Sequence, residues 1–232
     1  MVTDAPADVP AHDQYLDEFQ QSDDPTLGLG SARPGGFPDV GFGAEVHDPT
    51  DPYAAMIGEL RSFLDHVAAA DADDISLTRL AFDLAAWRDK LALVAVSERD
   101  QIFARRFDLP GRGQTMSPAF VVRDADAEHV TGTVRYGRYF LGGNGAVHGG
   151  AVTLLFDEVF GRLANSHRTP SRTAYLKTDY RAVTPVGPEL EVHVWLERIE
   201  GRKRFVRGTL THGTLLCAEA DALFVELREG QP

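Results

Sequence analysis

One segment constrains the fold of this chain more than any other. It runs from Gly143 to Gly161 and reads GNGAVHGGAVTLLFDEVFG, a glycine-rich approach to an apolar run with helical spacing. Strand-like patterns occur in two short stretches before it and four longer ones after it: 121–122, 130–134, 173–183, 190–199, 203–211 and 215–227. Strands gathered around one long helix predict an α+β domain in which an antiparallel sheet wraps the helix.

The chain before this domain divides where its composition changes. Residues 1–51 hold 11 acidic residues and one basic residue, so they carry −10 of the net charge of −12, and we expect a disordered acidic tail. Residues 52–108 show helical spacing twice. The first helix is expected to begin at Asp51-Pro52, and the second to be capped by Ser76 and to continue to about Phe103. We expect these helices to pack on each other or on the sheet domain, 109–232.

Composition excludes several classes of function. Residues 112–232 hold 15 basic and 14 acidic residues, far from the basic surface that nucleic-acid binding needs. Cys217 is the single cysteine and the eight histidines lack ligand spacing, so the sequence predicts neither a disulfide nor a metal. Neither a targeting signal nor a membrane span is expected, which favours a cytoplasmic protein.

The long helix carries the candidate chemistry. Gly149 and Gly150 would expose N–H groups at its first turn, where the helix dipole favours an anion or oxyanion. Asp157 falls on a mostly apolar face, where burial shifts a carboxyl pKa toward base chemistry. Glu158 has Arg162 four residues later, so we expect a solvent-facing ion pair. From the residues alone, purely structural interpretations remain open. The glycines could form an ordinary turn, Asp157 could cap another element, and His148 could be structural.

Other motifs fit this chain poorly. The sequence has neither G-x-S-x-G nor H-E-x-x-H, and the glycines at 143 and 145 lack the third glycine of a dinucleotide fingerprint.

The segment VHGGAVTLLFDEVFG instead resembles the central helix of hot-dog-fold acyl-CoA thioesterases, including the phenylacetic-acid-pathway and mitochondrial long-chain enzymes. In that family an Asp follows the His of His-Gly-Gly by nine residues, as Asp157 follows His148 here. The segments TAYLKTDYRAVTP (173–185) and EGRKRFVRG (200–208) are similar to two further family segments. The resemblance covers roughly 112–228.

This resemblance implies a fold, an activity and a set of site residues. It implies a hot-dog fold and a homodimer or dimer of dimers with active sites at the subunit interface. The substrate would be an acyl-CoA thioester in fatty acid metabolism, and coenzyme A would be part of the substrate, with no separate cofactor. The residues implied in catalysis are Asp157, His148, Gly149, Gly150 and Thr173.

Asp157 would act as general base or nucleophile, and Thr173 would position the attacking water. By parity along strand 173–183, Thr173, Asp179 and Arg181 would share one face. Asp179, Arg181, Arg202 and Lys203 would bind coenzyme A. A non-catalytic acyl-CoA sensor or carrier on this fold, and a hot-dog dehydratase or hydratase, remain alternatives. The sequence leaves acyl preference, coenzyme A against carrier protein, the pathway and the role of residues 1–108 undetermined.

Overall fold

The computed structural model describes residues 50–228 and residue 230. The predicted acidic tail therefore lies outside the described residues. The described residues begin with helices α2 (Pro52–Ala69) and α3 (Asp74–Ala92), followed by the short 3-10 turns η1 (Glu98–Asp100) and η2 (Pro110–Arg112). Among these described residues, no helix is long and apolar enough to cross a membrane.

The rest of the chain forms a sheet around one helix. Strands β1 (Phe120–Ala125) and β2 (His129–Arg135) come first, and then turn η3 (Arg138–Phe140) and the hairpin β3 (Leu141–Gly143) and β4 (Ala146–Val147). Helix α4 (Gly149–Asn165) precedes the four long strands β5 (Ser171–Tyr180), β6 (Glu189–Glu200), β7 (Lys203–His212) and β8 (Leu215–Glu226). The predicted strands and central helix are thus confirmed, with bounds that move by a few residues.

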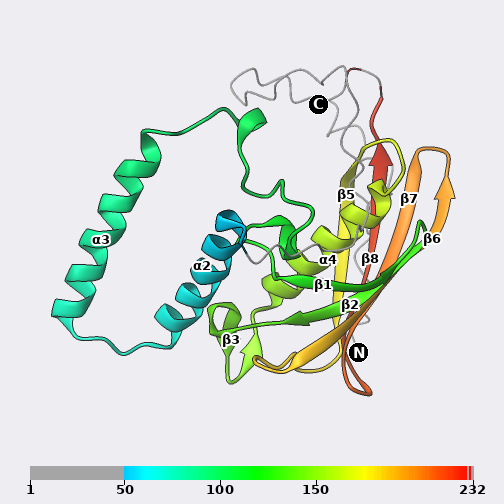
Figure 1. Ribbon diagram of the computed structural model, residues 1–232. Coiled ribbons are helices and arrows are strands. Elements are labelled where there is room, and N and C mark those ends of the chain that lie inside the picture. The colour runs from blue at the N-terminus through cyan, green and yellow to red at the C-terminus, as the bar shows by residue number, and fades with distance from the viewer. Residues whose placement is uncertain (1–49, 229, 231–232) are drawn as a thin grey trace, which may run out of the picture.

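The main sheet has the order β1-β2-β6-β7-β8-β5, and every neighbouring pair is antiparallel. It curves around α4 (Figure 1). Alternate residues of β6 face the helix: Leu190, Val192 and Val194 are almost fully buried. They pack with the apolar face of α4, which includes Leu155, Phe156, Val159, Phe160 and Leu163. The predicted α+β architecture is therefore confirmed.

One glycine shows how closely the sheet approaches the helix. A Cβ added to Gly208 of β7 would lie 2.7 Å from Cε1 of Phe160 and 3.0 Å from the His193 carbonyl oxygen. Because neither the backbone of the neighbouring strand nor a fully buried ring can yield easily, only glycine fits at this crossing.

Helix α2 begins as predicted and docks on the sheet domain. Asp51 caps it, because its Oδ1 accepts hydrogen bonds from the N–H groups of Tyr53 and Ala54. At the other end Asp65 accepts from the N–H of Tyr139 over 3.0 Å, which ties the helix to the turn before β3. The prediction that this helix packs on the sheet domain is confirmed.

Helix α3 differs from the prediction in three ways. Its N-cap is Asp73, whose side chain accepts from the Ser76 N–H, so Ser76 lies inside the first turn. It ends at Ala92, and turns replace the predicted continuation to Phe103. None of its residues is buried, and it stands apart from α2 and from the sheet (Figure 1). The expected packing of α3 is therefore absent in the described part of the chain.

Candidate active site

His148 caps the start of α4. Its Nδ1 accepts a hydrogen bond from the Gly150 N–H over 3.0 Å, and its own N–H donates to the Phe140 carbonyl over 2.8 Å. A neutral imidazole whose Nδ1 accepts carries its proton on Nε2. Because His148 is exposed, this Nε2–H is a donor that a ligand can reach.

This cap changes the predicted oxyanion site. The sequence predicts that the N–H groups of Gly149 and Gly150 act together. In the structure the Gly150 N–H is engaged by His148, whereas the Gly149 N–H has no acceptor within the part of the chain that the structure describes. The donors offered at the helix start are therefore the Gly149 N–H and the His148 Nε2–H, reinforced by the positive end of the helix dipole.

Tyr180 of β5 lies across the same helix start. Its Oη donates to the Gly149 carbonyl over 2.8 Å and lies 2.9 Å from Oγ1 of Thr153. A Cβ added to Gly149 would lie 3.0 Å from this Oη, so a larger residue would force the Tyr180 ring to move by a few tenths of an ångström. Sequence reasoning gave no role to Tyr180 or Thr153, although Tyr180 is the tyrosine of the 173–185 motif.

Asp157 and Thr173 are brought together, as the family resemblance implies. Asp157 lies two turns into α4 and is half-buried, and Thr173 lies on the edge strand β5. The Thr173 hydroxyl donates to Oδ1 of Asp157 over 3.0 Å. This bond fixes one carboxylate oxygen and leaves the other available to a ligand or water.

Within one chain, Asp157 lies well along α4 from the helix start. Seven residues separate it from Gly150, which at ~1.5 Å of rise per residue is about 10 Å along the helix axis. A carbonyl held at the Gly149 N–H is therefore out of reach of the Asp157 of the same chain.

Glu158 corrects a sequence prediction. Its side chain is 12% exposed and forms a two-point ion pair with Arg112, at 2.5 and 2.7 Å. Arg162, its predicted partner, is buried and donates to the Phe107 carbonyl over 3.0 Å. The loop before β1 thus supplies partners to both side chains. Glu158 ties this loop to α4 and does not face solvent.

A β-bulge corrects the predicted face of β5. The pairing with β8 shifts between Thr173 and Tyr175, so Thr173 turns toward α4 together with Thr178 and Tyr180. Asp179 pairs across the sheet with Glu219 and lies on the opposite face. The prediction that Thr173 and Asp179 share a face is wrong, because the extra residue reverses the alternation.

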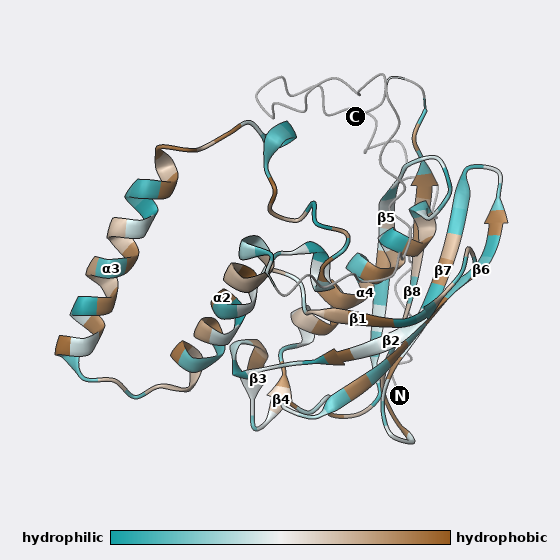
Figure 2. Cartoon of the chain, viewed as in Figure 1, coloured by the Kyte–Doolittle hydropathy of each residue, from teal (hydrophilic) through white to brown (hydrophobic). Residues whose placement is uncertain are grey.

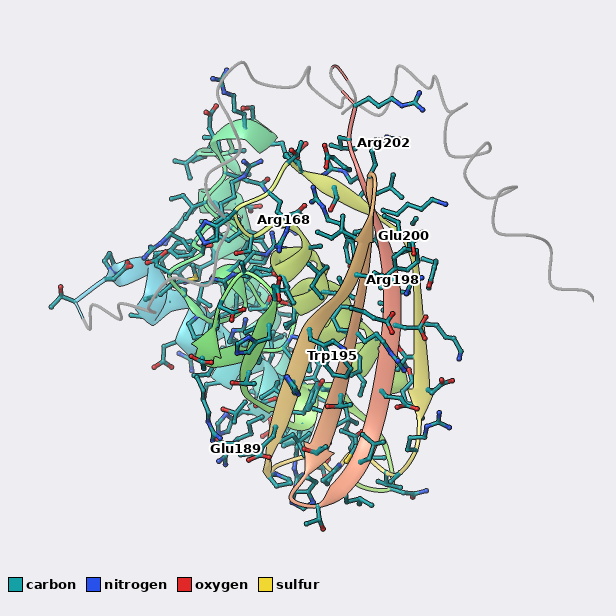
Figure 3. The ribbon with its side chains drawn as sticks, turned by 90° about the vertical axis from the view of Figure 1, so that its right-hand side faces the viewer. Arg168, Glu189, Trp195, Arg198, Glu200 and Arg202 are labelled. Carbon is teal, nitrogen blue, oxygen red and sulfur yellow. The ribbon has the colours of Figure 1, made fainter. Side chains whose placement is uncertain are left out.

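The four predicted coenzyme-binding residues fall into two groups. Arg181 forms an ion pair with Glu219, and Asp179 is 2.9 Å from the Lys177 ammonium, which lowers the pKa of the Asp179 carboxyl. Arg202 lies toward the other end of the sheet, where Figure 3 labels it, and donates to the Glu226 carbonyl over 2.8 Å.

Along β8 the two groups are about seven residues apart, which is roughly 23 Å at ~3.3 Å per residue. One chain therefore does not bring the predicted cations together. Lys203, beside Arg202, is half-buried and has no carboxylate partner among residues 50–228. It is the better placed of these cations to receive an anion.

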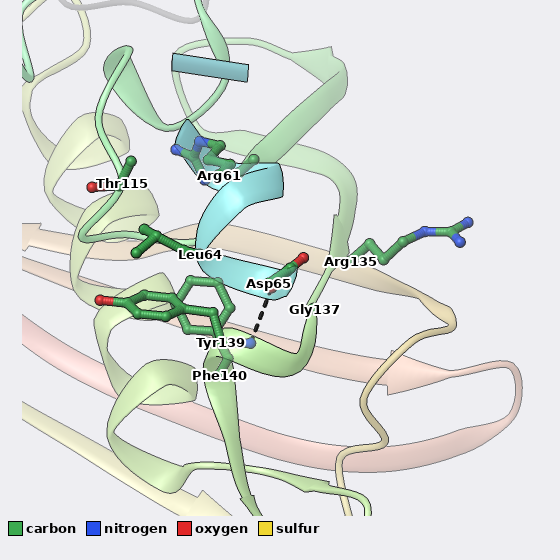
Figure 4. A pocket seen from close by; sticks show the side chains of 9 residues that line it. Arg61, Leu64, Asp65, Thr115, Arg135, Gly137, Tyr139 and Phe140 are labelled. Carbon is green, nitrogen blue, oxygen red and sulfur yellow. Dashed lines mark hydrogen bonds between the residues drawn. The ribbon is translucent and has the colours of Figure 1, made fainter. Parts of the chain in front are cut away.

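A cavity of about 100 Å³ lies between α2 and the η3 turn, lined by residues that include Arg61, Asp65, Arg135 and Tyr139 (Figure 4). Its two central polar groups are engaged. Asp65 accepts from the Tyr139 N–H, and Arg61 donates to the carbonyls of Gln114 and Ser117. None of the predicted site residues lines it. The structure also shows no cluster of three or more potential metal ligands in the described ranges.

Comparison with known proteins places this arrangement in a family. The sequence model described as "Thioesterase superfamily" matches residues 144–218, which include His148, Asp157 and Thr173. Protein PA0474 of Pseudomonas aeruginosa, provisionally named an esterase, is 30% identical over 112 residues, which cover 47% of this chain and 83% of that protein. The chain belongs to the thioesterase superfamily.

Two further relatives of this thioesterase superfamily member extend the match. Acyl-coenzyme A thioesterase THEM4 of Rattus norvegicus is 37% identical over 98 residues, which are 41% of this chain, and the match spans 42% of the length of THEM4. The crystal structure of a thioesterase superfamily protein superposes with a TM-score of 0.66 at 25% identity, over 76% of this chain and 92% of that one. The predicted hot-dog fold is confirmed.

Proposed function

We propose that the chain hydrolyses acyl-CoA thioesters to a free acid and coenzyme A. The observation that carries this proposal is the hydrogen bond from Thr173 to Asp157, which holds a half-buried carboxylate on the less buried side of α4. THEM4 is named an acyl-coenzyme A thioesterase, which supports the same substrate class.

The proposed site takes its halves from two copies of the chain. One copy supplies the Gly149 N–H and the His148 Nε2–H, and the second supplies Asp157 and Thr173. The separation of about 10 Å along α4, at ~1.5 Å per residue, supports this assignment. A homodimer is therefore part of the proposal.

In the first step the thioester carbonyl accepts hydrogen bonds from the Gly149 N–H and the His148 Nε2–H. Asp157 accepts a proton from water while the water oxygen bonds to the carbonyl carbon. The developing oxyanion is stabilised at the helix start, where removal of one such donor typically costs about 100- to 1,000-fold in rate. The carbon–sulfur bond then breaks, coenzyme A leaves as its thiolate, and the proton that Asp157 took from water passes to the sulfur.

The same geometry allows direct attack by Asp157, which would give a mixed anhydride that water then hydrolyses. Hydrolysis in water enriched in ¹⁸O tests for direct attack. Under single turnover, label in the Asp157 carboxylate demonstrates an anhydride to which water added on the Asp157 side, whereas water attack, or water addition on the acyl side of an anhydride, labels only the released acid.

For the coenzyme, Arg202 and Lys203 are the favoured contacts. Lys203 offers an ammonium without a carboxylate partner in the described residues, whereas Arg181 is neutralised by Glu219. Cations of this kind bind phosphate by charge-assisted hydrogen bonds.

The test measures thiol release from acyl-CoAs of C2 to C18 and from aryl-CoAs, with wild type, Asp157→Asn and Glu191→Gln as the matched surface control. We expect hydrolysis by wild type and the control and its loss in Asp157→Asn. If wild type binds acyl-CoA but releases no thiol above background, the hydrolase proposal fails and a non-catalytic acyl-CoA binding protein takes its place. Hydration of an enoyl-CoA without hydrolysis would instead indicate a hydratase.

A further inference from the structure

Helix α3 exposes an apolar surface. Nine large apolar side chains on α3 and just beyond it are 49–86% exposed: Ile75, Leu77, Phe82, Leu84, Trp87, Leu91, Leu93, Val94 and Val96. Figure 2 shows hydrophobic residues along this helix, which stands apart from the rest of the described chain. Helices of this length gain most of their stability from packing an apolar face, so α3 requires a cover.

Five apolar residues of α3 form one stripe. They follow one another at alternating spacings of three and four residues, and a sixth follows beyond the helix: Leu77, Leu80, Leu84, Trp87, Leu91 and Val94. We name these six the α3 seam. Such spacing is the a/d pattern by which two helices pack along a common line. Ile75 and Phe82 lie on the opposite side of the helix, because residues advance by ~100° each.

We propose that α3 packs antiparallel against α3 of a second copy through the α3 seam. The seam is symmetric about a point between residues 85 and 86. An antiparallel pair centred there places Leu84 against Trp87 of the second copy, Leu80 against its Leu91, and Leu77 against its Val94. A two-fold interface must be self-complementary in this way, and the spacing of the seam satisfies that condition at every layer.

Charge favours the same arrangement. Asp83 and Lys90 flank one side of the seam, and the antiparallel centre brings Asp83 of one copy beside Lys90 of the other, twice. A parallel pair would instead set the acidic helix starts, Asp73 and Asp74, side by side. Antiparallel helices also align opposite ends of their dipoles.

The area of the seam sets the strength of the contact. A large apolar side chain hides on the order of 100 Å² when it is buried. Six side chains that are already partly covered therefore bury roughly 400 Å² per copy, against about 800 Å² per partner for a standard interface. The α3 contact is therefore too small to hold two copies together alone, and it adds to another contact between them. That other contact is the one assumed for the proposed two-copy site, and the α3 proposal rests on the proposed function only in this point.

The first test compares two double variants of the full chain by sedimentation equilibrium. Leu84→Glu with Trp87→Glu places charge in the seam, whereas Ile75→Glu with Phe82→Glu places the same charge on the opposite side of the same helix. We expect the seam variant to weaken self-association at least roughly tenfold, and the control to match wild type. Equal effects of both variants, or no effect of either, would overturn the proposal.

A second test is independent of folding defects in the seam variant. In a Cys217→Ala background, chains with Leu84→Cys are mixed with chains carrying Trp87→Cys, and a short bismaleimide is added. We expect an 84–87 cross-link between copies and none between chains with Phe82→Cys. If wild type is a monomer whose α3 amides resist hydrogen exchange, another part of the same chain covers α3 and the proposal is wrong.

The outcome for α3 is separable from that for hydrolysis. The cross-link is expected unchanged in an Asp157→Asn background, since Asp157 is not part of α3. Loss of the cross-link with hydrolysis intact would refute the α3 pairing alone, and the converse would refute only the hydrolase proposal.

Discussion

The hydrogen bond between Thr173 and Asp157 gives the most direct test of the proposed site. Thr173→Val keeps the shape of the side chain and removes the hydroxyl that donates to Asp157 over 3.0 Å. A hydrogen bond to a charged group contributes about 1.5–3 kcal/mol. If that energy holds Asp157 in its reactive position, kcat/KM falls by about 10- to 100-fold, since about 1.4 kcal/mol corresponds to tenfold.

The assay is steady-state thiol release from the best acyl-CoA, with Thr173→Ser as the conservative variant that retains a hydroxyl. We expect Thr173→Ser to recover most of the activity that Thr173→Val loses. In an Asp157→Asn background the same Thr173→Val change should cost little further activity, because the carboxylate that the hydroxyl positions is already gone. A Thr173→Val enzyme within twofold of wild type, or losses that simply multiply in the double variant, would refute the positioning role.

Three further predictions concern stability. Glu158→Gln weakens the largely buried pair with Arg112 and is expected to lower the free energy of unfolding by about 2 kcal/mol in urea titrations; a loss below about 0.5 kcal/mol would mean that the pair is no stronger than an exposed one. Gly208→Ala forces a Cβ against Phe160 and is expected to cost about 1–3 kcal/mol, measured in the same way. His129 contacts two carboxylates that raise its pKa, so its contribution is present below about pH 6.5 and is lost as pH rises through the raised pKa. Thermal unfolding should therefore show wild type more stable than His129→Asn at pH 6, with the difference reduced at pH 9; a difference that grows with pH would contradict this sign.

The fold was predictable because apolar residues recur with a clear helical or strand period, and because the strands occur before and after one long helix in the sequence. In β6, Leu190, Val192 and Val194 alternate with exposed residues, and the same residues are buried in the structure. The start of α2 was also predictable, because Asp51-Pro52 combines a capping side chain with a first-turn proline. The pairing of Asp157 with Thr173 was implied by the resemblance to hot-dog thioesterases and could not be derived from the spacing of the two residues alone.

What could not be predicted depends on single residues and on distant partners. The bulge beside Thr173 adds one residue to β5, and a pattern of period two cannot show where such a residue falls. Glu158 has a favourable partner four residues away, yet it binds Arg112, which lies 46 residues earlier in the chain. Local rules rank neighbours on one helix, whereas a loop that crosses the helix can supply a stronger, two-point partner.

Both proposals about a second copy start from a feature that one chain leaves incomplete: the active site and the apolar stripe of α3. At the site, the carboxylate that Thr173 holds and the donors at Gly149 lie on the same helix, and the helix rise itself keeps them apart. On α3, an apolar stripe is folded without a cover in the described chain. Because α4 is a rigid helix, its start and its middle stay apart. Because α3 is a single helix, it cannot bury its own apolar stripe. In both proposals a second copy related by two-fold symmetry supplies what one chain lacks: the start of one α4 would meet the middle of the other, and one α3 seam would pack against its equal.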